Sequence, residues 1–368
     1  MNEIRKILVA CDKFKGSLSA PDACAAIARG LARRWPQAVI ETCPIADGGD
    51  GFAATLEGPL LGRWVEAPCH DPLGRPIRAS YLVVDSSEGV LAVMEMAAAS
   101  GMWRLSNDER DILLANTLGT GELMRHAIEQ TRAGRLILGI GGSATNDGGA
   151  GMAAALGVRF LDSNGLPLPP SPGIWGRRLS RIDASQRIAL PPVTVACDVA
   201  SPLLGPTGAT QIFGPQKGAD ESTIPVLEAA LEALVIAAGG AVAAARPGAG
   251  AAGGLGFGLL HFAGATLVSG FDLLADITGL SQRIAAADLV VTGEGSLDGQ
   301  TLAGKGPAGV ARLARSHGKP VWVFCGRSDS LARDSMAFDR VVDLASTGLP
   351  ITTLMSDAAR LLEDASAG

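Results

Sequence analysis

Residues 136–151 read LILGIGGSATNDGGAG, and this stretch is the best guide to the fold. The apolar run 136–140 has the composition of a buried strand, and a helix-forming run, 152–156, follows the glycines. Glycines let backbone N–H groups turn toward an anion, and the N-terminus of the next helix adds partial positive charge. The sequence therefore predicts a strand–loop–helix unit with a phosphate-binding loop. The alternative is a Gly-rich turn that only packs a helix closely against a sheet.

The same loop carries polar side chains among its glycines. One of them, Asp147, places a carboxylate beside the predicted phosphate site, and such a carboxylate is suited to hold a divalent cation. We therefore expect Asp147 to be a metal ligand. The residues of this loop that are predicted to bind phosphate or nucleotide are Gly141, Gly142, Ser143, Thr145, Asn146 and Gly148.

The composition is that of a globular protein with about two domains. The chain has 368 residues, of which 47% are hydrophobic and 18% are charged. Its net charge of −6 argues against nucleic acid as the main ligand. The six cysteines show no C-x-x-C spacing and no signal peptide precedes the first strand, so we expect a cytoplasmic protein. Segment 247–271 lacks charged residues, but its eight glycines disfavour a membrane-spanning helix.

Both ends of the chain alternate between strands and helices. The predicted strands at these ends are 7–10, 39–43, 288–292 and 321–325. Such alternation is typical of a parallel sheet with right-handed crossovers, and a long Ala-rich helix is expected over 222–238. We predict an α/β fold with two α/β domains and an active site in the cleft between them. A parallel-sheet domain is built from 1–63 and 286–368, and a mixed α/β domain, 64–285, is inserted into it.

Several predicted strands are followed within a few residues by an acidic side chain. In open α/β sheets, ligands bind at the carboxyl ends of the strands, so these acids are expected to meet at one cleft. Phosphoryl transfer needs acids to hold Mg²⁺ and to accept the proton of the attacking hydroxyl group. Any single acid in a turn is also an ordinary helix cap. The acids in question are Asp12, Asp47, Asp50, Asp147, Asp198, Glu294 and Asp298.

Four lysines lie in loops that contain glycine rather than on helix faces. They are Lys13, Lys15, Lys217 and Lys305. A cation on a short turn suits a phosphate or a carboxylate, which makes these lysines candidate ligand-binding residues. The alternative for each is a solvated surface lysine.

Other glycine patterns allow other interpretations. Residues 139–144 resemble a dinucleotide-binding fingerprint, and Asp162 lies near the spacing of the acid that holds the ribose. This pattern favours a dinucleotide-dependent hydroxy-acid oxidoreductase, but it leaves the lysine loops and the strand-end acids unexplained. The run 249–258, AGAAGGLGFG, is either a second backbone approach to a ligand or a tight helix-packing loop. A non-catalytic hydroxy-acid sensor is a third alternative, and it would bring a DNA-binding or partner-binding module that is not evident here.

Blocks along nearly the whole chain resemble the bacterial type 1 glycerate kinase family (glycerate 2-kinase). The matching blocks, in family order, are FKGSLSA (14–20), ADGGDG (46–51), GIGGSATNDGGAGM (139–152), CDV (197–199), FGPQKGA (213–219), GAAGGLG (250–256), TGEGSLDGQT (292–301) and GKGPAGVA (304–311). The chain departs from the family pattern at Lys13, Asp50 and Phe52, where Ser, Glu and Thr are common. The resemblance implies a flavodoxin-like domain from both termini and phosphorylation of D-glycerate by ATP and Mg²⁺, with 2-phosphoglycerate as the product.

With this resemblance, roles can be given to the candidate residues as hypotheses. The phosphates of ATP are expected on the glycine loop, residues 141–147. The predicted metal ligands are Asp147, Asp198 and Glu294. The predicted glycerate-binding residues are Lys13, Lys15, Ser17, Asp47 and Asp50. The predicted catalytic residues are Asp198 as general base, and Lys305 or Lys217 as the cation that neutralises the transferred phosphoryl group.

The expected ligands are thus D-glycerate, ATP and Mg²⁺, with no nucleic-acid or membrane partner. Attack by the 3-hydroxyl group, which gives 3-phosphoglycerate, is an open alternative. The oligomeric state is also open, and a homodimer is one alternative.

Overall fold

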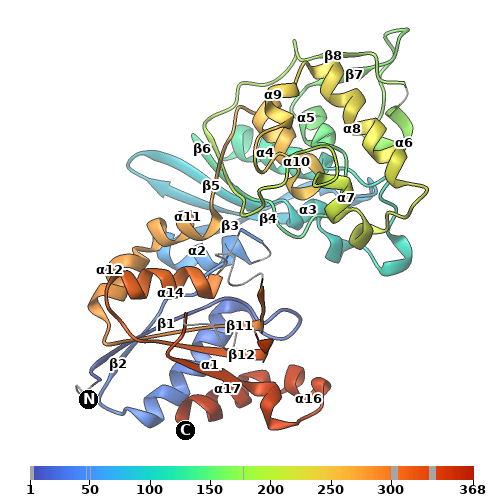
Figure 1. Ribbon diagram of the computed structural model, residues 1–368. Helices are drawn as coiled ribbons and strands as arrows, with labels where there is room; N and C mark the ends of the chain where they lie inside the picture. The colour runs from blue at the N-terminus through green and yellow to red at the C-terminus, as the bar shows by residue number, and fades with distance from the viewer. Residues whose placement is uncertain (1–3, 47, 50, 177, 300–305, 331–336) are drawn as a thin grey trace. The chain divides into compact units, whose positions relative to one another are not determined.

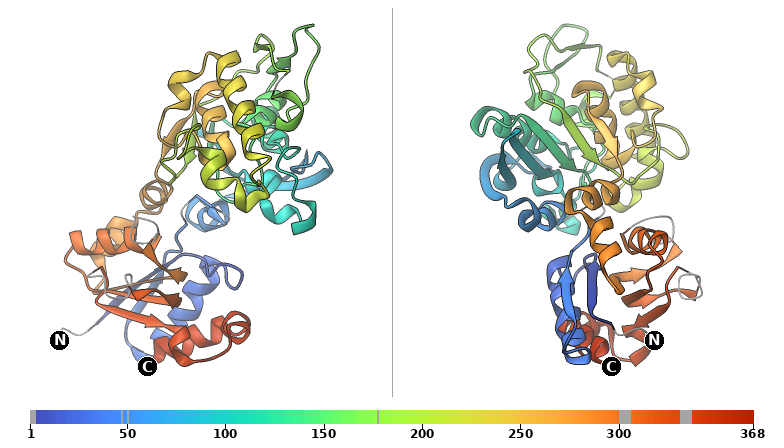
Figure 2. Two further views of the ribbon diagram at one scale, coloured as in Figure 1. Left: turned by 45° about the vertical axis from the view of Figure 1, so that its right-hand side comes forward. Right: turned by 90° about the vertical axis from the view of Figure 1, so that its left-hand side faces the viewer.

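The structure is a computed structural model of the 368-residue chain, and it describes every residue except 1–3, 47, 50, 177, 300–305 and 331–336. The chain forms two compact units. Unit 1 comprises Met1–Asp47 and Phe271–Gly368, and unit 2 comprises Gly48–Gly270. In Figures 1 and 2, unit 1 holds the blue and the orange-to-red ends of the chain, and unit 2 holds the cyan-to-yellow middle. The α/β class is confirmed, and the finer domain limit of 64–285 for the insert stays a prediction.

One parallel sheet forms the centre of unit 1. Within the described part of this unit, it has five strands in the order β13-β12-β11-β1-β2. The strands are β1 (Lys6–Cys11), β2 (Val39–Thr42), β11 (Leu289–Leu297), β12 (Val321–Ser328) and β13 (Arg340–Asp343). Counted along unit 1 alone, this is the 2-1-3-4-5 order of flavodoxin-like folds. The two ends of the chain meet where β1 pairs with β11, with Ile7 opposite Leu289.

Helices cover both faces of this sheet. Figure 1 shows α1 and α17 on one face, and α12 and α14 on the other. The helices of the two chain ends are α1 (Ala20–Arg34), α11 (Gly270–Thr278), α12 (Leu280–Ala286), α14 (Gly306–Ser316), α16 (Ile351–Ser356) and α17 (Ala358–Ala367), with the 3₁₀ helix η4 (Leu344–Thr347). Helix α1 begins at an N-cap, because the hydroxyl oxygen of Ser19 accepts the backbone N–H of Asp22 at 3.2 Å.

Helix α1 packs against α17 at Gly30, where there is no room for a side chain. A Cβ atom at Gly30 would overlap the carbonyl oxygen of Glu363 and the hydroxyl oxygen of Ser366. We expect Gly30→Ala to lower the free energy of unfolding by about 1–3 kcal/mol, because the two helices would be forced apart. Gly134→Ala is the control, since this exposed glycine has no positive φ and a Cβ atom there would meet only the carbonyl oxygen of Val90, at 3.8 Å, so the substitution should be neutral or stabilising. Urea denaturation measures both variants, and equal effects of the two substitutions would contradict the prediction.

Unit 2 contains a larger sheet of mixed direction. Among the described residues of this unit, the sheet has six strands in the order β10-β9-β6-β5-β4-β3. They are β3 (Arg63–His70), β4 (Pro76–Ser86), β5 (Gly89–Glu95), β6 (Arg135–Gly139), β9 (Val193–Ala196) and β10 (Thr266–Val268). Strand β4 is antiparallel to both β3 and β5, whereas the other neighbours are parallel. A separate antiparallel ribbon pairs β7 (Arg159–Leu161) with β8 (Arg181–Asp183).

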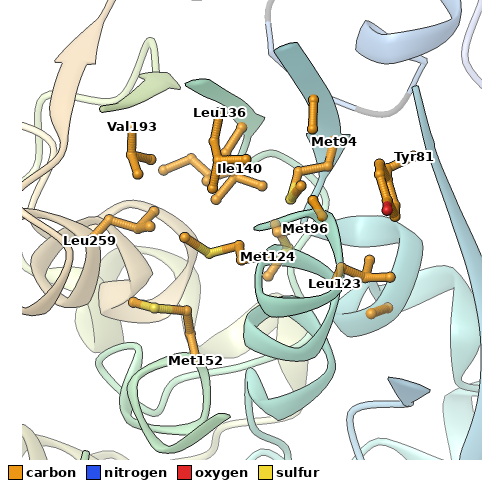
Figure 3. Packing of buried hydrophobic residues seen from close by; sticks show 14 of the residues in the cluster. Tyr81, Met94, Met96, Leu123, Met124, Leu136, Ile140, Met152, Val193 and Leu259 are labelled. Carbon is orange, nitrogen blue, oxygen red and sulfur yellow. The ribbon is translucent and has the colours of Figure 1, made fainter. Parts of the chain in front are cut away.

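Helices pack on this sheet and bury its apolar side chains. The helices of unit 2 are α2 (Phe52–Leu60), α3 (Ala97–Ser100), α4 (Leu118–Gln130), α5 (Ala150–Ala155), α6 (Pro172–Trp175), α7 (Ala209–Phe213), α8 (Ile224–Ala238), α9 (Ala241–Ala244) and α10 (Ala251–Phe262), with the 3₁₀ helices η1 (Met102–Arg104), η2 (Asn107–Glu109) and η3 (Pro215–Lys217). Figure 3 shows Leu136 and Val193 of the sheet pointing toward Met124, Met152 and Leu259 of the helices. This core holds β6 and α5 in place on either side of the glycine loop.

Segment 247–271, which lacks charged residues, is not one continuous helix. Its helix α10 leaves the helical backbone region at Ala252, Gly253 and Gly254, and strand β10 follows. No helix of the described chain is long and apolar enough to cross a membrane.

Candidate active site

A cavity of about 700 Å³ lies in unit 1 at the carboxyl ends of β1, β11 and β12. The strand order reverses between β1 and β11, and ligands of doubly wound sheets bind at this switch point. The polar residues that line the cavity are Asp12, Lys13, Lys15, Ser17, Glu294, Ser296, Asp298 and Arg327. Four of the predicted site residues, namely Lys13, Lys15, Ser17 and Glu294, are therefore brought to one cavity.

A tight loop after β1, residues 12–18, carries the cationic side chains and is called the lysine loop below. Phe14 and Leu18 exchange backbone hydrogen bonds of 2.9 Å, which close the loop. Asp12 is 8% exposed, and its Oδ1 accepts the backbone N–H of Lys13 at 2.7 Å. Lys15 lies on the exposed part of the loop. The lysine loop is thus a fixed support that presents two ammonium groups at the cavity.

Side chains from β11 and β12 complete the polar lining. The Nε of Arg327 donates to the hydroxyl oxygen of Ser296 at 3.1 Å, which orients the guanidinium group at the end of β12. Glu294 and Asp298 add carboxylates from the end of β11. Cations and carboxylates around one space suit a phosphorylated ligand that carries a divalent cation. Arg327 is missing from the sequence-based candidates, although it follows the predicted strand 321–325 in the same way as the acids follow theirs.

The rest of the lining is apolar and comes mainly from η4, α16 and the residues between them. Leu349, Ile351 and Met355 line the cavity and are 38%, 63% and 42% exposed; we call these three residues the apolar wall. A cluster of exposed large apolar residues is typical of a binding surface. The hydroxyl group of Ser17 donates to the carbonyl oxygen of Met355 at 2.6 Å, so the apolar wall and the lysine loop are joined.

The glycine loop after β6 turns most of its polar groups into the interior of unit 2. The backbone N–H groups of Gly141, Ala144 and Gly148 donate to carbonyl oxygens of unit 2 at 3.0–3.1 Å. Of the residues predicted to bind phosphate, Gly142 is exposed and Gly141 is half-buried; the buried ones are Ser143, Thr145, Asn146 and Gly148. This arrangement resembles a Gly-rich turn that packs a helix closely against a sheet, which was the alternative to a phosphate-binding loop. Phosphate binding by the loop stays a prediction.

Close packing against the run 249–258 explains several of the glycines. A Cβ atom at Gly149 would lie 2.8 Å from the Cα of Gly258. Gly253 has φ of 65°, and a Cβ atom there would overlap the carbonyl oxygen of Thr145. Only glycine combines this backbone conformation with so close an approach. Of the two interpretations of the run 249–258, these contacts favour the helix-packing loop.

Asp147 is fully buried, and both of its carboxylate oxygens accept hydrogen bonds. Its Oδ2 accepts the backbone N–H and the hydroxyl of Thr117, both at 2.8 Å, and the N–H of Gly151 at 2.9 Å. Its Oδ1 accepts the N–H of Gly149 at 3.1 Å. Burial raises the pKa of the Asp147 carboxyl, and these hydrogen bonds oppose the shift. Asp147 therefore caps the start of α5, and its role as a metal ligand stays a prediction.

Lys217 is buried in the same region of unit 2. Its Nζ donates to the carbonyl oxygen of Thr145 at 2.8 Å, so the side chain ties η3 to the glycine loop. Beside Thr145, the Nδ2 of Asn146 donates to the hydroxyl oxygen of Thr210 at 2.9 Å. These contacts make Lys217 a support of the loop, and its predicted contact with a phosphoryl group stays a prediction.

The protonation of Lys217 should make stability depend on pH. Burial lowers the pKa of Lys217 to about 7 from an ordinary value of 10.5, and the charge of Asp147 opposes the shift. Between these pH values the unfolded chain binds a proton that the folded chain has released, so the free-energy cost of burying Lys217 falls as pH rises. We expect the free energy of unfolding of the wild type, relative to Lys217→Met, to rise by about 2 kcal/mol from pH 7 to pH 9. Urea denaturation at several pH values measures it, and a constant difference would contradict the assignment.

Asp198 follows β9 and is exposed. Its Oδ1 accepts the backbone N–H of Gly270 at 3.0 Å, which orients the carboxylate without burying it. Asp198 belongs to unit 2 and Glu294 to unit 1. Three further predicted residues, Asp47, Asp50 and Lys305, lie outside the described residues.

The described residues offer few donors for a metal ion. Among them, no group of three or more His, Cys, Asp or Glu side chains could hold a metal ion. Mg²⁺ in phosphoryl-transfer sites is commonly held by one or two carboxylates together with the phosphates of the substrate. The carboxylates that line the cavity fit this smaller requirement.

Asp162, the acid of the dinucleotide interpretation, closes a turn. Its Oδ1 accepts the backbone N–H groups of Asn164 and Leu166, both at 2.9 Å. It follows β7 of the separate two-stranded ribbon, whereas the ribose-binding acid of a dinucleotide fold follows a strand of the parallel sheet. The geometry therefore disfavours the oxidoreductase interpretation.

Comparisons with known proteins point to one family. A model of the glycerate kinase family matches residues 7–368. Glycerate kinase of Bacillus subtilis (strain 168) is 42% identical, over 97% of this chain and 95% of the relative. Glycerate 2-kinase of Escherichia coli (strain K12) is 42% identical, over 86% of this chain and 84% of the relative. The crystal structure of a protein assigned as glycerate kinase 2 from Salmonella typhimurium LT2 matches with a TM-score of 0.82 and 37% identity, over 99% of this chain and 97% of that chain.

Proposed function

The chain belongs to the glycerate kinase family, and on this premise we propose that it transfers the γ-phosphoryl group of ATP to the 2-hydroxyl group of D-glycerate, giving 2-phosphoglycerate and ADP. The observation that carries the proposal is the cavity at the switch point of unit 1, where lysine, arginine and carboxylate side chains line one space. Such a set of charges suits phosphoryl transfer, which depends on positioning and on neutralising phosphate charge.

The reaction needs an acceptor for the proton of the attacking hydroxyl group, and we assign this role to Asp198. Its carboxylate is exposed and is oriented by the N–H of Gly270. The hydroxyl oxygen of glycerate forms a bond to the γ-phosphorus, and the bond from that phosphorus to the bridging oxygen breaks. ADP leaves with the electron pair, and the hydroxyl proton passes to Asp198.

Mg²⁺ is part of the proposal, because it neutralises phosphate charge when it is bound with ATP. Of the predicted ligands we retain Glu294, which lines the same cavity as Lys13 and Lys15. Asp147 is not retained, because its oxygens already accept hydrogen bonds inside unit 2. Asp198 is reserved for the base, since a carboxylate bound to a cation is a poor proton acceptor.

The six cysteines are all free. This supports the proposal that the protein works in a reducing, cytoplasmic compartment.

ADP release from ATP tests the proposed activity. We expect release that requires D-glycerate and that stops when a chelator removes Mg²⁺. ADP release without any organic acid, or none with D-glycerate, would contradict the proposal. Reduction of a nicotinamide cofactor by D-glycerate without ADP release would instead support the oxidoreductase alternative.

A further inference from the structure

The cavity of unit 1 has two chemically distinct parts. One part carries the ammonium groups of the lysine loop together with Arg327, and the other is the apolar wall. The hydrogen bond from Ser17 to the carbonyl oxygen of Met355 joins the two parts within one cavity. A ligand that fills the cavity therefore needs an anionic end and a flat or bulky apolar end.

The size of the cavity indicates which of the two substrates of the proposed reaction it binds. Its volume of about 700 Å³ lies in the upper part of the range of small-molecule and cofactor sites, which is about 300–1,000 Å³. Glycerate is a three-carbon acid in which every carbon bears oxygen. It has no apolar surface to bury against Leu349, Ile351 or Met355, and it would leave most of the cavity to water.

The glycine loop of unit 2 offers less to a triphosphate. The backbone N–H groups of Gly141, Ala144 and Gly148 already donate to carbonyl oxygens inside the unit. A phosphate-binding loop needs such groups to point at the ligand. The position of the cavity, at the carboxyl ends of β1 and β11, is by contrast the position at which doubly wound sheets bind nucleotides.

We propose that the cavity of unit 1 is the nucleoside triphosphate site, with the base on the apolar wall and the phosphates at Lys13, Lys15 and Arg327. This assignment rests on the proposed function, which supplies ATP as the phosphoryl donor. It gives the lysine loop to the nucleotide instead of to glycerate, the ligand expected there from the sequence. Glu294 then faces the phosphates and their Mg²⁺ from the same cavity.

Ile351→Asp tests the assignment. Ile351 is the first residue of α16 and is 63% exposed, so an aspartate is compatible with folding, as a thermal melt of the variant will check. The change removes apolar contact from the base and puts a charged carboxylate against it. We expect the Kd for ADP, measured by titration calorimetry without glycerate, to rise at least about tenfold. KM for ATP should rise in parallel, and KM for D-glycerate should stay within about twofold of the wild type.

Two further variants sharpen the test. Val242→Asp is the matched control, because Val242 is 84% exposed on the short helix α9 in unit 2, and it should leave all three constants unchanged. Leu349→Asp, which changes another residue of the apolar wall, should reproduce the effect of Ile351→Asp.

The outcomes separate this assignment from the proposed function. If Ile351→Asp raises KM for D-glycerate and leaves ADP binding intact, the cavity binds the acid and the assignment is wrong. If the wild type phosphorylates glycerate and neither apolar-wall variant changes any constant, the assignment again fails while the proposed function stands. If the wild type binds ADP, the apolar-wall variants lose it, and D-glycerate never stimulates ADP release, the nucleotide site stands and the proposed function fails.

Discussion

Asp198→Asn is expected to lower kcat by about 10²–10⁴-fold, the usual contribution of a general base. The KM values for ATP and D-glycerate should change by no more than about threefold, because the substitution removes proton transfer rather than binding. Asparagine keeps the side-chain oxygen that accepts the N–H of Gly270, so the local structure should persist. Steady-state kinetics over a range of pH measures the effect. In the wild type kcat/KM should fall at low pH as the base is protonated, and this fall should be absent in the variant.

Asp162→Asn is the control for this experiment. Asp162 is also an acid after a strand of unit 2, and asparagine can keep its turn by accepting the N–H groups of Asn164 and Leu166. Activity close to that of the wild type is expected. Near-normal turnover of Asp198→Asn would show that another group accepts the proton. Loss of activity in Asp162→Asn alone would support the dinucleotide interpretation, in which Asp162 holds the ribose.

Asp147→Ala is expected to lower the free energy of unfolding by about 3–5 kcal/mol. The substitution leaves the N–H and hydroxyl of Thr117 and the N–H groups of Gly149 and Gly151 without an acceptor. These donors are buried with Asp147, so water does not replace the lost carboxylate and the unpaired donors destabilise the fold. Urea denaturation with and without Mg²⁺ measures the loss, which should be the same in both conditions.

Asp220→Ala isolates the effect of burial. The Oδ1 of Asp220 also accepts several hydrogen bonds, from the N–H and hydroxyl groups of Ser222 and Thr223 at 2.8–3.0 Å, but the residue is exposed. Its removal should destabilise the fold far less than Asp147→Ala does, because water can take the place of an exposed acceptor. An Asp147→Ala variant of normal stability whose activity needs far more Mg²⁺ would contradict the capping role and restore the metal-ligand prediction.

The sequence predicted the fold well where the signal is local. The apolar run 136–140 became β6, Arg135–Gly139, and the expected helix 222–238 became α8, Ile224–Ala238. Alternation of short apolar runs with helix patterns at both chain ends indicated the parallel sheet, which the pairing of β1 with β11 confirms. These features depend on periodicity within a few residues, which a single sequence displays directly.

The roles of the glycine loop and of the cavity could not be read from the sequence in the same way. Close backbone packing and phosphate binding both select glycine, and the contact of Gly149 with Gly258 joins residues far apart in the chain. Ile351 and Met355 are missing from the sequence-based candidates, because only the folded chain leaves them exposed in a cavity. The lysine loop was recognised as a ligand site, but the size of the space beside it depends on β12 and α16.

The identity of the phosphorylated product is the most direct test that the chain is a kinase acting on the 2-hydroxyl group of D-glycerate. Purified protein is incubated with D-glycerate, ATP and Mg²⁺, and product is detected through enolase, which consumes 2-phosphoglycerate. The proposal predicts an enolase signal without added phosphoglycerate mutase. A signal that appears only after mutase is added would place the phosphoryl group on the 3-hydroxyl group and contradict it.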